Sequence, residues 1–102
     1  MVTQNAPITK HLPAVIIGGG QAGLATGYFL KKAGKDFIIL DENKNIGDSW
    51  RNRWDSLQLF TPAQHDSLPG MPFPAFKDSF PGKDQMADYL QIYAARFSLP
   101  VH

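Results

Sequence analysis

Two short apolar runs flank a segment in which apolar positions recur every three to four residues. Ala14–Ile17 is a continuous apolar run, which is typical of a strand buried on both faces of a parallel sheet. Phe37–Leu40 is a second continuous apolar run. Gln21–Lys32 has the spacing of an amphipathic helix. Gly34 follows two lysines and is a typical helix stop. The order predicts an α/β fold with a β-α-β unit and an incomplete parallel sheet.

The second half of the chain shows a long irregular stretch and then a second helical pattern. Residues 43–81 hold most of the prolines and many aromatics, which favours an ordered, loop-rich lid over a solvated linker. Residues 56–60 are its one candidate strand. A C-terminal helix is expected to begin at Gly82 or Lys83, with another strand beginning within residues 99–102. The apolar stripe of that helix, expected in the core, consists of Met86, Tyr89, Leu90, Tyr93 and Phe97.

Size and composition narrow the class of protein. A chain of 102 residues has room for one domain, and we expect a flexible lead-in over residues 1–12 and a folded part over residues 13–102. A formal charge of +1 is too small for the basic surface that nucleic-acid binding needs. Without cysteine there is no disulfide and no thiolate nucleophile. Neither a signal peptide nor a membrane span is evident, so the sequence predicts a soluble, cytoplasmic protein.

A glycine-rich motif directly follows the first predicted strand and opens the predicted helix. It fits G-x-G-x-x-G and reads Gly18-Gly19-Gly20-Gln21-Ala22-Gly23. Gly18 permits the tight turn, Gly20 lets a pyrophosphate approach the backbone, and Gly23 lets the helix pack on the sheet. The helix N-terminus offers free N–H groups and partial positive charge to the phosphates. The motif in this context predicts a dinucleotide site.

An acidic residue ends the second predicted strand, eighteen positions after Gly23. Asp41 is expected to accept hydrogen bonds from the adenosine ribose hydroxyls, with Glu42 beside it as a further candidate. An acid here disfavours NADP at this site and leaves FAD and NAD open. The alternative is a plain glycine turn with Asp41 capping or solvated.

Four further segments together resemble the start of the flavin-containing monooxygenase family, most closely its shorter bacterial and plant auxin-synthesis-type members. They are Asn45-Ile46-Gly47-Asp48-Ser49-Trp50-Arg51, Leu57-Gln58-Leu59-Phe60-Thr61-Pro62, Leu68-Pro69-Gly70-Met71-Pro72-Phe73-Pro74 and Tyr89-Leu90-Gln91-Ile92-Tyr93-Ala94. The resemblance implies a Rossmann domain that binds FAD, with Asp41 on the ribose. It also implies Ser49 and Trp50 beside the cofactor and Thr61 near the flavin, and we add Arg51 as a candidate. Pro62 stands where animal members tend to carry Asn, so a polar contact from that position is not expected.

The activity implied by the resemblance is an NADPH-dependent oxygenation in which reduced FAD forms a C4a-hydroperoxide. The sequence has no second G-x-G-x-x-G for NADPH, so we expect an N-terminal fragment, engineered, proteolytic or from a split gene, that is inactive alone. Such a fragment leaves apolar faces uncovered and is expected to associate with its missing remainder or with a second copy. We assign no catalytic residue.

Alternative functions and roles stay open at this point. The chain could be a cofactor-free Rossmann fragment that serves as an assembly or regulatory module, or a simple flavin- or NAD-dependent reductase. The lack of cysteine and the segment around Ser49 count against a disulfide reductase. Trp50 and Trp54 can be packing residues, the favoured interpretation for Trp54. Arg51 and Arg53 can pair with surface carboxylates, which we favour for Arg53. His65 receives no role, and no metal site is expected.

Overall fold

The fold begins with the predicted β-α-β unit. The computed structural model describes residues 11–102, so residues 1–10 of the expected lead-in lie outside the described residues. Strand β1 (Ala14–Ile17) leads through helix α1 (Gln21–Lys32) into strand β2 (Phe37–Leu40). The strands pair in parallel, with Ala14 opposite Phe37 and Ile17 opposite Leu40. The predicted elements and strand direction are confirmed.

The end of the chain returns to the sheet on the free side of β2. Val101 forms a parallel bridge with Ile39. The Ile39 N–H donates to the Pro100 carbonyl over 2.9 Å, and the His102 N–H donates to the Ile39 carbonyl over 2.8 Å. Where another strand was expected to begin, residues 99–102 form a single parallel bridge and not a full strand, and β2 lies between β1 and this segment.

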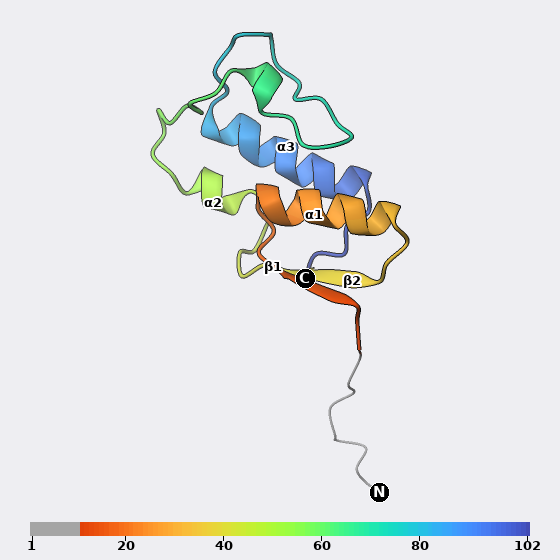
Figure 1. The fold of residues 1–102 in the computed structure, drawn as a ribbon. Coiled ribbons are helices and arrows are strands. Elements are labelled where there is room, and N and C mark those ends of the chain that lie inside the picture. The colour runs from red at the N-terminus through yellow and green to blue at the C-terminus, as the bar shows by residue number, and fades with distance from the viewer. Residues whose placement is uncertain (1–10) are drawn as a thin grey trace, which may run out of the picture.

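Within residues 11–102, one face of the sheet is covered and the other is exposed. Helix α1 lies over the covered face (Figure 1), where Leu24 and Ile39 are fully buried. On the other face Val15 is 51% exposed and Ile17 is 80% exposed. The expectation that Ala14–Ile17 is buried on both faces is wrong for the described residues, because nothing within residues 11–102 covers this second face. The expectation of an uncovered apolar face is confirmed.

Helix α1 ends as its sequence predicts, although its buried side differs from the apolar pattern. Gly34 has a φ of +71°. Its N–H donates to the Lys31 carbonyl, and the N–H of Lys35 donates to the Leu30 carbonyl. This pair of bonds satisfies the last carbonyls of the helix. Phe29, although apolar, is 56% exposed, because Leu24 and Gly27 occupy the side that faces the core.

The irregular stretch is ordered and contains two short helices, α2 (Asp48–Arg51) and the 3₁₀ helix η2 (Ala63–His65). The expected strand over residues 56–60 is wrong, because only one antiparallel bridge forms, between Gln58 and Gly82. The facing segment contains Pro81, whose carbonyl accepts from Leu59. Proline has no N–H to return, so a regular ladder cannot continue through it.

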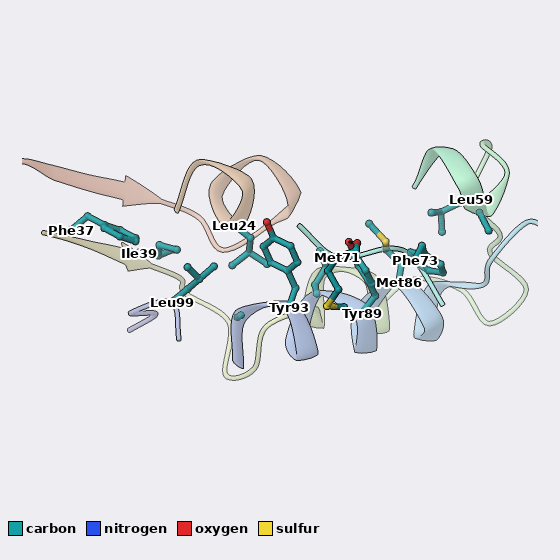
Figure 2. Close-up of a cluster of buried hydrophobic side chains, with 13 residues drawn as sticks. Leu24, Phe37, Ile39, Leu59, Met71, Phe73, Met86, Tyr89, Tyr93 and Leu99 are labelled. Carbon is teal, nitrogen blue, oxygen red and sulfur yellow. Dashed lines mark hydrogen bonds between the residues drawn. The ribbon is translucent and has the colours of Figure 1, made fainter. Parts of the chain in front are cut away.

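Helix α3 (Lys83–Arg96) carries most of the core. Met86, Leu90 and Tyr93 are fully buried and Tyr89 is 1% exposed, so the predicted stripe is confirmed. Figure 2 shows the buried cluster running from the sheet, past α1 and α3, to the irregular stretch. No helix within residues 11–102 combines the length and the apolar character that crossing a membrane requires.

Two buried tyrosines of α3 fix the irregular stretch. The Tyr89 hydroxyl donates to the Met71 carbonyl and accepts from the Leu68 N–H, both over 2.7 Å. The Tyr93 hydroxyl donates to the Pro69 carbonyl over 2.6 Å. Each hydroxyl satisfies backbone groups that would otherwise be buried without a partner.

Tyr93 gives the fold a predicted sensitivity to alkaline pH. Burial, together with the neighbouring hydroxyls of Tyr89 and Tyr28, raises the pKa of Tyr93 to about 12. In the unfolded chain its pKa is about 10. Its contribution to stability is therefore complete below about pH 10 and is lost as the pH rises toward about 12. Chemical denaturation at several pH values should show a smaller alkaline loss for Tyr93→Phe; an unchanged pH profile would contradict this.

Candidate functional site

The predicted dinucleotide residues meet in a cleft at the carboxyl ends of the strands. This glycine cleft has a volume of about 730 Å³. Six predicted residues line it: Gly18, Gly19, Gly20, Asp41, Glu42 and Ser49. Ligands of open α/β sheets bind at this end of the strands.

The glycine loop is shaped for close approach of a ligand. Gly18 has a φ of +98°, and its N–H donates to the Leu40 carbonyl over 2.7 Å. A Cβ added at Gly19 would lie 2.8 Å from Oδ2 of Asp41, whereas one added at Gly20 would meet no atom within 4 Å. The chain itself leaves the space beside Gly20 open.

Gly23 packs the helix onto the loop. A Cβ at this position would lie 2.0 Å from the Gly18 carbonyl oxygen. Any side chain at the third glycine of the motif would therefore overlap the backbone of the loop. Gly27, one turn later, also lies close to the sheet, since a Cβ there would be 3.0 Å from Cδ1 of Ile39. Sequence analysis missed Gly27, although a glycine inside a helical pattern is a signal for close packing.

The first turn of α1, which begins beside the cleft at Gly20, has unused backbone donors. Gly20 is the N-cap, no side chain caps the helix, and the first turn holds no acidic residue. The first backbone bond of the helix runs from the Leu24 N–H to the Gly20 carbonyl. The preceding N–H groups have no acceptor within the helix, and such groups bind phosphate. The residues present therefore fit a diphosphate.

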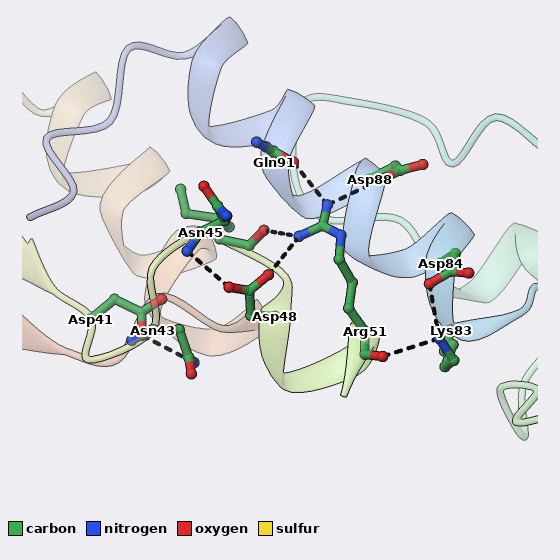
Figure 3. A network of polar contacts seen from close by, with 10 residues as sticks. Asp41, Asn43, Asn45, Asp48, Arg51, Lys83, Asp84, Asp88 and Gln91 are labelled. Atoms are coloured by element: carbon green, nitrogen blue, oxygen red, sulfur yellow. Dashed lines mark hydrogen bonds and ion pairs between the residues drawn. The ribbon is translucent and has the colours of Figure 1, made fainter. Parts of the chain in front are cut away.

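Asp41 is held at the edge of the cleft by its own turn. Its Oδ1 accepts from the Asn43 backbone N–H over 3.1 Å and from the Asn43 side-chain amide over 3.3 Å (Figure 3). Its backbone N–H donates to the His102 carbonyl over 2.9 Å. Oδ2 lies on the other side, beside Gly19. One carboxylate oxygen thus fixes the side chain, and the other faces the glycine loop.

Asn43 and His102 also line the cleft, and sequence analysis missed both. Their positions carry a usable signal, because each lies just beyond the carboxyl end of a strand and those ends meet at one sheet edge in a parallel sheet.

A second pocket contains other predicted residues, two of which are next in sequence to residues of the glycine cleft. This Trp50–Thr61 pocket has a volume of about 390 Å³ and includes Gln21, Trp50 and Thr61 in its lining. Gly20 lines the glycine cleft and Gln21 the second pocket; likewise Ser49 lines the first and Trp50 the second. The two linings therefore contain neighbouring residues at the starts of α1 and α2.

Asp66 is a residue of the second pocket for which the sequence offers no signal. It lies in the pocket lining and is only 7% exposed. The Thr61 hydroxyl donates a hydrogen bond to its Oδ1. Its Oδ2 is buried without a hydrogen-bond partner among residues 11–102.

Arg51 lines neither pocket and instead joins α2 to α3. Its guanidinium donates to the Ile46 carbonyl over 2.8 Å, to Asp48 and Asp88 over 3.1 Å each, and to Gln91 over 2.8 Å (Figure 3). The hydrogen bond to Asp88 is the main reason that the pKa of Arg51 is raised. A contact between Arg51 and a cofactor stays a prediction. Ala22 and Gly23 do not line either pocket.

Two packing expectations are wrong. Arg53, expected to pair with a carboxylate, donates to the Ser49 carbonyl over 3.2 Å and lies over the Trp50 ring at 5.8 Å. The hydrogen bond to the Ser49 carbonyl holds the Arg53 guanidinium at the start of α2. The cation therefore lies over the Trp50 ring and does not pair with a carboxylate. Trp54 is 61% exposed and lines the second pocket. Trp50 is partly buried against the core and also lines that pocket.

Replacing Arg51 with lysine should weaken the junction between α2 and α3. A lysine keeps the charge but cannot contact four acceptors in one plane, and we expect the free energy of unfolding to fall by about 1 kcal/mol. Arg53→Lys is the matched control, with little expected change because its contacts are exposed. Urea denaturation measures both. Equal effects of the two substitutions would show that the junction adds no stability.

Comparison with known proteins places this geometry in a family. The family model for pyridine nucleotide-disulphide oxidoreductases matches residues 15–102. A CzcO-like oxidoreductase of Geobacillus kaustophilus is 51% identical over 94 residues, which cover 91% of this chain and 27% of that protein. A probable indole-3-pyruvate monooxygenase of Arabidopsis thaliana, YUCCA3, is 43% identical over 86 residues, which cover 83% of this chain and 20% of that protein.

A solved structure gives the same result. The flavin-containing monooxygenase from Stenotrophomonas maltophilia superposes with a TM-score of 0.80 and 43% identity, over 86% of this chain and 27% of that chain. The chain thus spans about a quarter of the length of such relatives. The resemblance to flavin-containing monooxygenases is confirmed, and the chain belongs to the pyridine nucleotide-disulphide oxidoreductase family.

Proposed function

We propose that this chain forms the FAD-binding portion of an NADPH-dependent, flavin-monooxygenase-like oxidoreductase. One observation carries the proposal: the space beside Gly20 is free of protein atoms at the point where α1 presents unpaired N–H groups. A diphosphate is the ligand chemistry that fits such a space. FAD, when bound, would supply the redox and oxygen-activating chemistry.

The diphosphate, the adenosine ribose and the flavin end of FAD each have residues of matching chemistry in the two pockets. The diphosphate fits the backbone of Gly18–Gly20 and the first turn of α1. The adenosine ribose fits the oxygen of Asp41 that faces the loop, with Glu42 in the same lining. The flavin end fits the Trp50–Thr61 pocket, whose residues Gln21 and Trp50 are next in sequence to Gly20 and Ser49 of the glycine cleft. The share of this chain in the reaction is to bind and orient the cofactor.

The remaining functions belong to the full-length relatives, of which this chain covers about a quarter. We propose that NADPH binding and catalysis need further segments, so that the chain alone is inactive. The folded domain over residues 13–102, the association with a remainder or a second copy, and the cytoplasmic location stay predictions.

An adenosine nucleotide test distinguishes this site from a glycine turn without a ligand. ADP should bind, and 5′-AMP should bind more tightly than 2′,5′-ADP, which is 5′-AMP with an added 2′-phosphate, because that phosphate brings negative charge to the carboxylate of Asp41. Asp41→Ala should weaken ADP binding about tenfold, which is the loss of a charged hydrogen bond, and should remove the preference. Isothermal titration calorimetry measures these affinities.

Asp36→Ala is the matched control, because Asp36 lies just before β2 and Asp41 just after it. The control should bind ADP like the unmodified chain. Equal ADP affinities for Asp41→Ala and the unmodified chain would remove Asp41 from the site. No ADP binding by the unmodified chain would remove the nucleotide site itself.

A further inference from the structure

The buried carboxylate of Asp66 has one oxygen that the described chain does not use. Its backbone N–H donates to the Ala63 carbonyl over 3.1 Å, which sets the residue at the end of η2. Oδ1 accepts from the Thr61 hydroxyl, while Oδ2 has no partner within residues 11–102. A buried acceptor without a donor is costly and rare in folded proteins. It therefore indicates that something else supplies the donor.

The surroundings of Asp66 indicate where that donor comes from. Asp66 lies in the lining of the Trp50–Thr61 pocket. The residue as a whole is 7% exposed and Oδ2 has less than 1 Å² of exposed surface, so a donor in the pocket reaches Oδ2 through a small rotation of the carboxyl group. A carboxylate accepts hydrogen bonds and cannot donate them. The occupant of the pocket must then present an N–H or O–H group to this corner.

We infer that Asp66 is a cofactor-binding residue whose Oδ2 accepts a hydrogen bond from the ribityl–isoalloxazine part of FAD. This part carries ribityl hydroxyls and a ring N–H, which are donors of the required kind. The inference rests on the proposed function, because it needs FAD to extend from the glycine cleft into the second pocket. It adds a residue outside the glycine motif that distinguishes the whole flavin from its ADP half.

The same geometry changes the part assigned to Thr61. A hydroxyl has one proton to donate, and that of Thr61 goes to Asp66. Thr61 can therefore meet the flavin through its oxygen lone pairs or its methyl group, and its donor function is to orient Asp66. Thr61 is a positioning residue for the Asp66 carboxylate.

The test compares FAD with ADP on the complete chain by isothermal titration calorimetry. Asp66→Leu is close in size and has no acceptor, so it should weaken FAD binding about tenfold, the loss of one charged hydrogen bond. ADP binding should be unchanged, because ADP reaches only the glycine cleft. Asp78→Asn is the control, since Asp78 is exposed and bonds to Gln64 outside both pockets.

Each outcome decides the inference. Unchanged FAD affinity in Asp66→Leu overturns it. If Asp66→Leu loses ADP binding as well, Asp66→Asn replaces it, because asparagine keeps the shape of aspartate and one oxygen. An equal loss of FAD and ADP affinity in Asp66→Asn makes Asp66 structural and overturns the inference. A loss confined to FAD supports the inference. An unmodified chain that binds FAD no more tightly than ADP overturns the inference but leaves the nucleotide site intact. An unmodified chain that binds neither ligand contradicts the proposed function itself.

Discussion

Gly23→Ala is expected to lower the free energy of unfolding by about 3 kcal/mol, the upper range for overpacking a close contact. The added Cβ would lie 2.0 Å from the carbonyl oxygen of Gly18. The position of a Cβ is fixed by the backbone of its own residue and the oxygen belongs to the backbone of Gly18, so no side-chain rotation relieves the overlap. The helix must move away from the loop that it supports, and FAD binding should fall with stability. Thermal and urea denaturation measure the first effect.

Gly27→Ala is the matched control for this substitution. Its Cβ would meet side-chain atoms of Ile39 and Phe37 at 3.0 Å and 3.2 Å, which can shift by small rotations. Alanine also favours a helix over glycine by about 1 kcal/mol. We therefore expect a nearly neutral change. If Gly23→Ala is as mild as Gly27→Ala, α1 does not need its close contact with the loop.

Gly20→Val is expected to separate binding from folding. A side chain at this position meets no protein atom within 4 Å, and the φ of −85° at Gly20 suits valine. The stability cost should stay near that of a lost helix cap, about 1 kcal/mol or less. The valine side chain would fill the space that we propose for the diphosphate, and we expect FAD affinity to fall at least about a hundredfold.

Gly82→Val offers a close control. Gly82 is the N-cap of α3 with a φ of −80°, and a Cβ there has only ordinary contacts, the nearest at 3.8 Å. It lies outside both pockets, so this variant should keep full FAD affinity, measured by fluorescence titration. Retained FAD binding in Gly20→Val would move the site away from the glycine loop.

The local pattern of apolar and polar residues was sufficient to predict the elements that position the glycine cleft. The β-α-β unit follows from two apolar runs and a helical spacing, and the roles of Gly18 and Gly23 follow from the motif. These elements were predictable because strands, turns and helices are encoded by residues that are close together in the sequence. The same locality explains why the end of the helix at Gly34 was predictable.

Contacts between distant parts of the chain were not predictable. Arg51 contacts Asp88 and Gln91 across the junction of α2 and α3, and no local pattern encodes such a pairing. The strand expected over residues 56–60 failed for a similar reason, because its partner is a segment with Pro81. Asp66 became a candidate only through its burial and its unpaired oxygen. Nothing in its sequence neighbourhood distinguishes it from a surface residue of a turn.

The most direct measurement is the amount of FAD that the unmodified 102-residue chain retains after incubation with FAD and gel filtration. We predict one FAD for each chain, visible as flavin absorption that travels with the protein peak. A chain that elutes colourless after incubation with excess FAD would contradict the cofactor site at the glycine loop.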